Sequence, residues 1–239
     1  KKIRRADRII VISDFIRNEA IQIFGFTPDQ LTTIPLGVDQ EIYKVYQLRD
    51  LSETREKYHL PENFILFVGS IEPRKNLERL LLAYQDLEES TRKGVKLVLV
   101  GFQGWKNEGI VTLMRKMKGD VFYLGYVPEV DLGKIYNLAR LFIYPSLYEG
   151  FGLPPLEAMA CGCPVVVSNT ASLPEVCGEA AYYVDPQDLN SISEGIGRVL
   201  RDDGFRNALA QKGIDRASSF SWEKSARAHL RLFEEALSG

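Results

Sequence analysis

The sequence predicts an α/β protein built on a doubly wound parallel sheet, and three observations lead to this fold class. Short runs of β-branched and aromatic residues alternate with amphipathic helical patterns along most of the chain. Most of these runs are apolar almost throughout, as in parallel strands that helices cover on both faces. The repeated order of strand, loop and helix is the plan of a doubly wound sheet.

The predicted strands are the short apolar runs of the chain, and the predicted helices are the segments with helical spacing between them. The strands are Ile9–Ile12, Leu31–Ile34, Ile65–Val68, Lys96–Val100, Val121–Leu124, Leu141–Tyr144, Val165–Val167 and Ala181–Val184. The helices are Asp14–Phe24, Leu77–Leu87, Gly109–Lys118, Val130–Ala139, Pro155–Cys161, Leu189–Leu200, Phe205–Ala217 and Trp222–Leu237. We expect Asn76 to be the N-cap of the second of these helices.

The composition is that of a soluble globular protein. The chain has 239 residues, which is long for one domain and short for two at roughly 150 residues each. Hydrophobic residues make up 45% and charged residues 26%, which excludes disordered, collagen-like and coiled-coil classes. The net charge is −2. We therefore expect no nucleic acid partner, and any anion site must be local.

The first 40 residues stand apart from the repeated pattern. They read as strand, helix and strand, followed by the turn-rich segment Pro35-Leu36-Gly37-Val38-Asp39. A polar stretch over 45–58 separates this segment from the next strand. We place a domain boundary between about Pro35 and Lys57, which divides the chain into residues 1–40 and 41–239.

The cysteines and histidines do not indicate a metal site or a disulfide framework. Cys161, Cys163 and Cys177 form no CxxC pair, so we expect buried free thiols in a reducing, cytoplasmic compartment. His59 and His229 are isolated, and the chain has no DxD triplet. We therefore expect no bound metal, and a structural role for each histidine.

Three unusual loops follow predicted strands, where ligands of doubly wound sheets bind. The first is Gly69-Ser70-Ile71-Glu72-Pro73-Arg74-Lys75-Asn76. Gly69 permits close approach of a ligand, and Arg74 and Lys75 directly precede a helix N-terminus that favours an anion. The loop therefore indicates a phosphate or diphosphate site. The alternative is a solvated turn with two surface bases.

The second loop is Tyr148-Glu149-Gly150-Phe151-Gly152-Leu153-Pro154-Pro155-Leu156-Glu157. Its glycines let consecutive main-chain N–H groups turn toward one point, and its prolines favour the start of a helix. Glu149 stands before the glycines, where it can meet ligand hydroxyls or a developing positive charge. Glu157, expected in the first helical turn, can accept hydrogen bonds from a diol such as a ribose. The alternative for Glu157 is complementation of the helix dipole.

The third loop, Gly125-Tyr126-Val127-Pro128, follows the strand that ends at Leu124. Its main chain and small apolar residues suit the edge of a flat base. An ordinary turn between a strand and a helix explains it equally well.

Taken together, these loops resemble glycosyltransferase family 4, the retaining nucleotide-sugar transferases of the GT-B fold. The resemblance runs through nearly the whole chain in the family's order. Its segments are Val68–Asn76, Leu124–Pro128, Pro145–Pro154, Glu157–Val166, Leu173–Val176 and Gly178–Ala180.

The resemblance implies that residues 41–239 form a Rossmann-like donor domain, the C-terminal half of a GT-B enzyme. It implies that residues 1–40 are the remnant of the acceptor domain with the hinge, toward which the last helix, about 222–237, returns. It further implies that the substrate is a GDP- or UDP-sugar rather than a cofactor, and that no metal is needed. A mannose-type hexose is favoured, with a saccharide or lipid-linked acceptor. We expect this half to bind donor and to be inactive alone.

The resemblance also assigns roles to residues of the three loops. Lys75 and Arg74 neutralise the diphosphate, Glu157 holds the ribose hydroxyls, and the main chain of Val127 meets the base. Glu149 contacts the donor sugar, together with the main-chain amides of Gly150, Phe151, Gly152 and Leu153. Many family members carry arginine directly after the first glycine, where this chain has Ser70 next to Gly69. Arg74 is the candidate to replace that charge.

Three other functions are compatible with parts of the pattern. A nucleotide-sugar-binding module without catalysis and a GT-B nucleotide-sugar epimerase would each use the same loops. A nicotinamide-dependent enzyme fits poorly, because it needs a Gly-x-Gly-x-x-Gly loop. The loop after Val68 has one glycine and two bases instead.

The basic start of the chain, with Lys1, Lys2, Arg4 and Arg5, runs directly into the first predicted strand. From this abrupt opening we expect a piece of a longer protein. These bases are a candidate contact with the inner face of a membrane. The alternative is the solvated face of a truncated helix.

Overall fold

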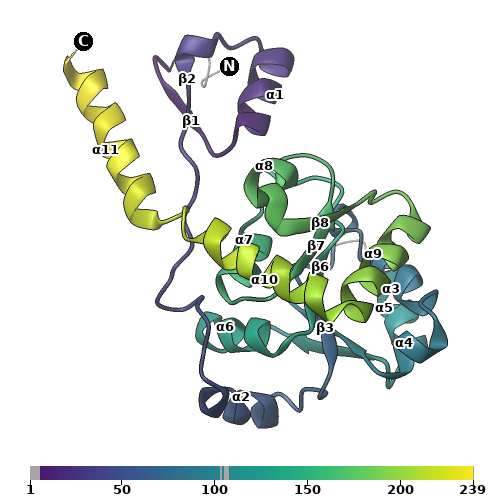
Figure 1. Ribbon diagram of the computed structural model, residues 1–239. Coiled ribbons are helices and arrows are strands. Elements are labelled where there is room, and N and C mark those ends of the chain that lie inside the picture. Colours follow the sequence, from purple (N-terminus) through teal and green to yellow (C-terminus); the bar gives the residue numbers. More distant parts are fainter. Residues whose placement is uncertain (1–5, 103, 105–107, 239) are drawn as a thin grey trace.

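The computed structural model describes residues 6–102, 104 and 108–238, which form two lobes (Figure 1). The basic residues at positions 1–5 lie outside the described residues. A small N-terminal lobe stands apart from a larger main lobe, and the linker and the last helix join the two. The sequence predicts the α/β class correctly.

The N-terminal lobe contains β1 (Ile9–Val11), α1 (Asp14–Phe24), η2 (Pro28–Gln30) and β2 (Leu31–Thr33). Its two strands pair in parallel, with Ile9 opposite Leu31. Val11, Ala20 and Leu31 form a small core of its own, separate from that of the main lobe. Ser13 caps α1, since its Oγ accepts a hydrogen bond from the amide of Ile16.

The main lobe is built on a six-stranded sheet with the strand order β5-β4-β3-β6-β7-β8, in which every pairing is parallel. This order places β3 and β6 side by side at the centre, although they lie far apart in the sequence. The strands are β3 (Phe64–Val68), β4 (Lys96–Val100), β5 (Val121–Gly125), β6 (Leu141–Tyr144), β7 (Val165–Ser168) and β8 (Ala181–Val184).

Helices cover both faces of this sheet (Figure 1). On one side α3 contacts α5 and α9, and on the other α7 contacts α6, α8 and α10. Their bounds are α2 (Ser52–Lys57), α3 (Leu77–Gln85), α4 (Glu89–Lys93), α5 (Glu108–Lys116), α6 (Glu129–Leu138), α7 (Leu153–Ala160), α8 (Leu173–Cys177), α9 (Leu189–Arg201), α10 (Asp203–Ala217) and α11 (Trp222–Ser238). Single 3-10 turns are η3 (Leu48–Asp50), η4 (Pro73–Lys75) and η5 (Gly178–Ala180).

The predicted strands are confirmed to within one residue at each end. The longer predicted helices are confirmed too, but the sequence missed α2, α4 and α8. These have five or six residues, too few to show a helical period. The polar stretch over 45–58, predicted as a separator, contains η3 and α2.

The buried thiols are confirmed. Cys161, Cys163 and Cys177 are all free and buried, and burial raises the pKa of each thiol above its ordinary value. In the described part of the chain, no helix is long and apolar enough to cross a membrane.

The chain crosses between the lobes twice, and the two crossings run side by side. The amide of Val38 donates to the carbonyl of Phe220 at 3.4 Å, and Val38 bridges Ser221. Beyond this point α11 runs along the N-terminal lobe (Figure 1). A cavity of about 670 Å³ between them is lined by Arg8 and Ile10 on one side and Phe233 on the other.

The N-terminus of α1 is also anchored on the main lobe. The amides of Asp14 and Phe15 donate to the two carboxylate oxygens of Glu175, at 2.8 and 3.0 Å. Ser13 Oγ donates to the carbonyl of Gly150 at 2.7 Å. A glutamate of one lobe therefore supplies the cap that a helix of the other lobe needs.

Replacing Glu175 by alanine should loosen this anchor. We expect a loss of about 1 kcal/mol in local stability, the usual cost of removing a helix cap. Hydrogen exchange at the amides of Asp14 and Phe15 should accelerate about fivefold. Glu179→Ala is the control, because Glu179 is 96% exposed and its nearest cation, Lys212, is 3.9 Å away. Equal exchange rates in both variants would contradict the anchoring role.

Candidate functional site

The three predicted loops all lie at the carboxyl edge of the main sheet. The loop from Gly69 follows β3, and the loop that carries Glu149 follows β6. Because β3 and β6 are neighbours, these two loops meet directly. The third loop, after β5, lies on the far side of β4 from them.

A buried ion-pair cluster joins the first two loops. Glu149 Oε1 lies 2.7 Å from Lys75 Nζ, and Glu149 Oε2 lies 2.9 Å from Arg74 Nη1. Arg74 also pairs with Glu72 at 2.8 Å, and its guanidinium stays partly exposed. Lys75 and Glu149 are each only 7% exposed. The structure thus brings together Lys75 and Arg74, which the resemblance assigns to the diphosphate, and Glu149, which it assigns to the donor sugar; these three are the candidate catalytic residues.

Burial and charge act against each other in this cluster. Burial by itself raises the pKa of the Glu149 carboxyl, but the charge and hydrogen bond of Lys75, helped by Ser146 and Arg74, outweigh it and hold that pKa below its ordinary value. Burial lowers the pKa of Lys75 more than Glu149 raises it. Glu149 is therefore an ionised carboxylate held by two cations.

Side chains that sequence reasoning did not single out support the cluster. Ser146 Oγ donates to Glu149 Oε1 at 2.6 Å, and Lys75 Nζ also donates to the hydroxyl of Tyr144. Ser172 Oγ lies 2.9 Å from the carbonyl oxygen of Glu149 and 2.8 Å from that of Phe151. Only the fold places Ser172 there, because it comes from the segment after β7.

Asn76 occupies the predicted N-cap position of α3, but its side chain makes no capping bond. Its main chain is left-handed, with φ 59°. Its Nδ2 instead donates to the carbonyls of Pro145, at 2.9 Å, and Pro186, at 2.7 Å. Asn76 Oδ1 accepts from the guanidinium of Arg79 in α3 at 3.0 Å. Asn76 therefore ties the first loop to the segments that follow β6 and β8.

The glycine loop offers free hydrogen-bond donors beside Glu149. Among the described residues, no acceptor meets the main-chain amides of Gly150, Phe151 and Gly152. Gly152 has φ 112°, which side-chain-bearing residues rarely adopt, and α7 starts directly after it at Leu153. This helix start, two residues earlier than predicted, adds a further unpaired amide. The donors suit an anion or sugar oxygens.

Glu157 is not where the sequence placed it along the helix. Because α7 begins at Leu153, Glu157 lies in the second turn, so it does not complement the helix dipole. It accepts a hydrogen bond from the hydroxyl of Tyr136 at 3.1 Å. Burial raises the pKa of Glu157 to about 7, the Tyr136 bond opposes the rise, and Glu129 adds to it. Near neutral pH this carboxyl changes charge readily.

The remaining predicted residues occupy different depths. Val127 is buried, with 4% of the residue exposed, so the predicted contact of its main chain with the base stays a prediction. Phe151 is buried, and its ring packs edge-on against Phe220 at 5.9 Å. Gly69 and Ser70 are half-buried at the start of the first loop.

No cluster of three or more metal-ligating side chains occurs in the residues described. Of the two histidines, His59 is left-handed with φ 49°, and His229 Nδ1 lies 2.9 Å from the carbonyl oxygen of Ser225. The expected independence from metal stays a prediction.

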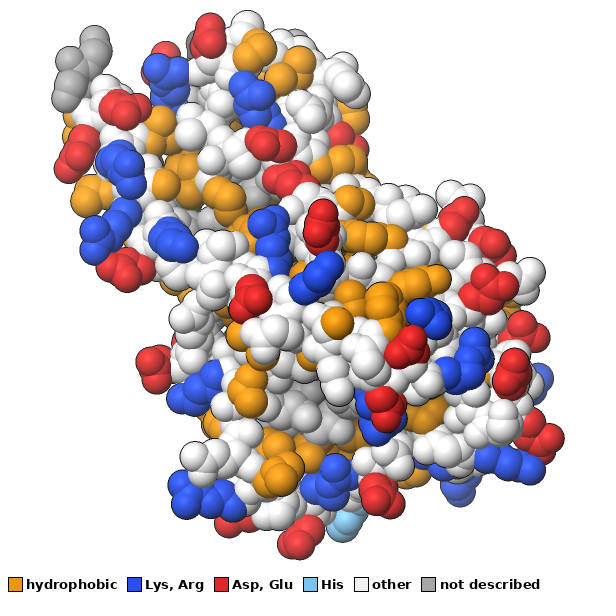
Figure 2. Space-filling model, viewed as in Figure 1, with side chains coloured by type: hydrophobic (Ala, Val, Ile, Leu, Met, Phe, Trp, Pro, Cys, Tyr) orange, Lys and Arg blue, Asp and Glu red, His pale blue; other side chains and the backbone are white. Residues whose placement is uncertain are grey.

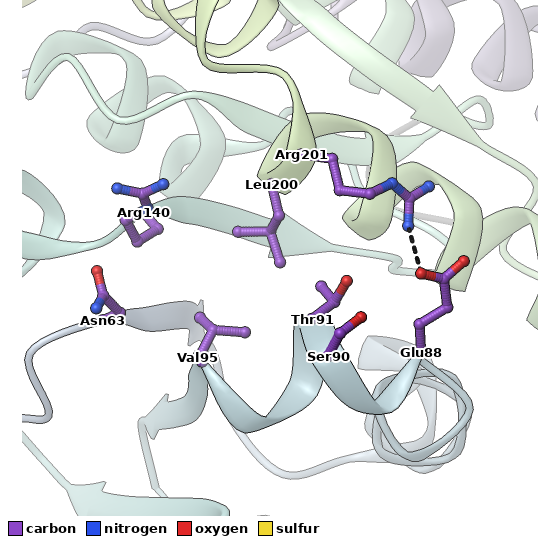
Figure 3. Close-up of a pocket in the computed structure, with 9 residues that line it drawn as sticks. Asn63, Glu88, Ser90, Thr91, Val95, Arg140, Leu200 and Arg201 are labelled. Carbon is purple, nitrogen blue, oxygen red and sulfur yellow. Dashed lines mark ion pairs between the residues drawn. The ribbon is translucent and has the colours of Figure 1, made fainter.

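A cavity of about 460 Å³ lies at the opposite edge of the sheet (Figure 3). Asn63, Val95 and Arg140 in its lining directly precede β3, β4 and β6. Its other arginine, Arg201, lies 4.0 Å from Glu88, and Arg140 lies 3.6 Å from Asp203. Since carboxylates accompany both arginines and no predicted site residue lines this cavity, it is separate from the candidate site.

The charged side chains are mixed on the visible face of the protein. Figure 2 shows lysines and arginines interspersed with acidic residues, with no broad area of one sign. This distribution agrees with the expectation of a local anion site.

The titration of Glu157 should be visible in the stability of the protein. Its carboxyl has an ordinary pKa of 4.5 and a folded pKa of about 7, so the folded state binds more protons between these values. The free energy of unfolding is therefore highest at low pH. It falls by at most about 3 kcal/mol as the pH rises from about 4.5 to 7. Glu157→Gln should flatten the fall of the melting temperature over this window.

The control for this titration is Glu78→Gln, which neutralises an exposed carboxylate in the first turn of α3. This variant should keep the wild-type slope. A wild-type melting temperature that rises between pH 5 and 7, with Glu157→Gln following the same curve, would contradict the assignment.

Comparison with known proteins identifies the family of this chain. A family model described as Glycosyl transferases group 1 matches residues 50–216. O-antigen chain mannosyltransferase B of Escherichia coli is 42% identical over 232 residues, covering 96% of this chain and 61% of that protein. Serotype-specific mannosyltransferase WbdA of Escherichia coli is 34% identical over 238 residues, covering 98% of this chain and 29% of that protein. This chain thus spans less than two thirds of the length of these relatives.

Solved structures of the same fold cover the two lobes together. Sucrose-phosphate synthase from Thermosynechococcus elongatus has a TM-score of 0.85 at 28% identity, covering 98% of this chain and 59% of that one. HepE of Anabaena in complex with UDP-glucose has a TM-score of 0.86 at 20% identity, covering 96% of this chain and 64% of that one. The family model covers more than half of the sequence, and the chain belongs to the group 1 glycosyl transferases.

Proposed function

We propose that this chain is the donor-binding half of a retaining glycosyltransferase that moves a mannose-type hexose from a nucleoside diphosphate sugar to a saccharide or lipid-linked acceptor. The observation that carries the proposal is the Glu149 cluster with Arg74 and Lys75, next to free main-chain amides at the start of α7. The preference for mannose is supported by the two relatives described above, both of which are mannosyltransferases.

In this proposal the two cations serve the leaving diphosphate. When the bond between the sugar C1 and the diphosphate breaks, the electron pair leaves with the diphosphate, where negative charge grows. Arg74 is the more accessible cation, since its side chain is 42% exposed, and Lys75 lies deeper at 9%. Both are held in place before the ligand arrives, which is the condition for effective electrostatic stabilisation. Arg74 takes the charge that Ser70 does not supply.

Glu149 fixes both cations and lies beside the donor sugar. Its carboxylate bridges Lys75 and Arg74, and its loop continues into the unpaired amides of Gly150 and Phe151. Those N–H groups and the carboxylate are suited to sugar hydroxyls, which both donate and accept hydrogen bonds. Glu149 also stabilises positive charge that develops at C1.

Glu157 receives the ribose hydroxyls in its ionised form. A carboxylate accepts hydrogen bonds from both hydroxyls of a diol, whereas its protonated form gives up one acceptor position. Ribose hydroxyls that donate to Glu157 add to the bond from Tyr136 and so favour the charged state over the burial that opposes it. Donor binding and ionisation of Glu157 are therefore coupled.

The two lobes correspond to the two domains expected from the sequence. Residues 1–40 belong to the acceptor domain with the hinge, and 41–239 form the donor domain. Two observations support this division: the N-terminal lobe has its own sheet and core, and the family model begins at residue 50. The anchor of α1 on Glu175 and Gly150 then holds the acceptor domain next to the donor loops.

Replacing Lys75 by alanine should weaken donor binding and slow transfer. In the whole enzyme we expect kcat/KM to fall by an amount that corresponds to about 2–4 kcal/mol of lost transition-state stabilisation. This is the scale of one removed electrostatic stabiliser. In this chain calorimetric titration with GDP and UDP should show weaker binding, and Arg74→Ala should act in the same direction. Lys212→Ala removes an exposed charge elsewhere and is the matched control.

Unchanged binding and turnover in both Lys75→Ala and Arg74→Ala would refute the diphosphate assignment. Melting temperatures of the variants must be compared first, because Lys75→Ala leaves the buried Glu149 with fewer partners.

The chain by itself should bind donor without transferring sugar. The acceptor side of the site is expected from the part of the enzyme that this chain does not include, since the chain covers 61% of the 42% identical mannosyltransferase. Incubation with labelled GDP- and UDP-sugars, followed by product analysis, should show neither glycoside nor epimerised sugar. Formation of a glycosylated acceptor would overturn the prediction that this half is inactive alone. Formation of an epimerised nucleotide sugar would show that the protein is an epimerase rather than a transferase.

A further inference from the structure

Tyr144 places a hydroxyl group inside the apolar core, directly below the candidate site. The residue is the last of β6, and none of it is exposed to solvent. Its ring stacks on those of Phe67 and Phe142, with centroids 5.9 and 5.6 Å away and planes inclined by 30° and 24°. Because this packing holds the ring, the hydroxyl group at its end has one defined position.

The hydroxyl of Tyr144 meets both charged groups of the buried ion pair. Its oxygen accepts a hydrogen bond from Lys75 Nζ. Burial, the negative charge of Glu149 and a hydrogen bond to that carboxylate hold the pKa of Tyr144 well above its ordinary value. The hydroxyl therefore stays protonated, so it can donate to Glu149 while it accepts from Lys75.

The partners of this hydroxyl differ from those of a buried tyrosine elsewhere in the core. Burying a hydroxyl costs free energy unless it is hydrogen-bonded, so its partners indicate its role. Tyr84 is equally buried, and its hydroxyl donates to the main-chain carbonyl of Val95 at 2.8 Å, which fastens α3 to the segment before β4. The hydroxyl of Tyr144 instead contacts charged side chains of the candidate site.

Two of the three N–H bonds of the Lys75 ammonium are occupied in this arrangement. One donates to the hydroxyl of Tyr144, and another donates to Glu149 Oε1 at 2.7 Å. In the described part of the chain, no acceptor meets the third. Because an ammonium nitrogen is tetrahedral, two fixed N–H bonds and the side-chain carbon also fix the direction of the third N–H. Glu149 alone would leave the ammonium free to rotate about one hydrogen bond.

A fixed ammonium is an advantage in a site that binds an anion. Ordering a lysine side chain costs conformational entropy, and this cost reduces affinity when the ligand has to impose the order. Contacts that hold Lys75 before the ligand arrives remove the cost from the binding step. A cation held in advance also stabilises developing negative charge most effectively.

We propose that Tyr144 is a positioning residue, whose hydroxyl, together with Glu149, directs the third N–H of Lys75 toward the diphosphate of the donor. The inference rests on the proposed function, because it assigns the diphosphate to Lys75. Tyr144 itself does not touch the ligand and acts only through the ammonium.

Titration calorimetry of the chain with GDP and inorganic pyrophosphate tests this role. Tyr144→Phe keeps the ring and removes the hydroxyl. It should weaken the binding of both ligands about tenfold, the scale of one hydrogen bond to a charged group. Tyr84→Phe is the matched control, since it removes an equally buried hydroxyl that bonds only main chain, and it should bind both ligands like wild type.

A double-mutant cycle with Lys75 separates positioning from a general structural effect. Lys75→Met keeps the length of the side chain and removes its charge. In the Lys75→Met background, Tyr144→Phe should change GDP binding by no more than about twofold, because it acts through the missing ammonium. A structural effect of Tyr144→Phe would instead weaken binding by the same factor in both backgrounds.

Hydrogen exchange of the Lys75 ammonium gives a readout without any ligand. Proton–nitrogen NMR spectra of the ligand-free chain should show a slowly exchanging ammonium signal that is lost in Lys75→Met. Tyr144→Phe should accelerate the exchange of this signal, because one N–H loses its acceptor, whereas Tyr84→Phe should not.

The outcomes separate this inference from the proposed function. If wild type binds neither ligand, the proposed function fails, and the diphosphate role of Tyr144 fails with it. If wild type binds both and Tyr144→Phe binds them equally well, only the positioning role is overturned. An equal loss in the wild-type and Lys75→Met backgrounds, or an unchanged exchange rate of the ammonium in Tyr144→Phe, overturns the positioning role as well.

Discussion

The buried ion pair between Glu149 and Lys75 is the interaction on which the candidate site depends. Taking a carboxylate and an ammonium out of water is costly unless each finds partners of good geometry. Here Arg74 supplies a second cation, and Ser146 and Tyr144 supply further hydrogen bonds. The pair joins two loops far apart in the chain that meet because β3 and β6 are neighbours. The positions of both cations therefore follow from the central strand pairing of the sheet.

The same loop also positions the N-terminal lobe. Ser13 donates to the carbonyl of Gly150, one residue after Glu149, and Glu175 accepts from the first amides of α1. Tyr148 packs edge-on against Phe15 with ring centroids 5.7 Å apart. A movement of α1 would therefore displace the loop that carries the ion pair, because the two are in direct contact. The arrangement of the lobes and the geometry of the site are mechanically linked.

Two glutamates of one sequence motif have opposite electrostatic environments. Burial acts on both, but Glu149 faces two cations, whereas Glu157 has a phenol hydroxyl and a nearby carboxylate. The pKa of the first is held low and that of the second is raised to about 7. Identical side chains eight residues apart therefore titrate differently, since one remains charged and the other titrates near neutral pH.

The sequence by itself determined the α/β class, the strand positions and the loops of the site, because apolar runs, helical spacing and glycine loops are local features. The tertiary structure decided what joins across the sheet: the side chain of Asn76, at the N-cap position of α3, bonds the segments after β6 and β8, and Ser172 comes from the segment after β7. It also decided that the hydroxyl of Tyr144 meets the ammonium of Lys75. These contacts depend on the order of strands within the sheet, which brings together residues distant in the chain and which no local pattern specifies.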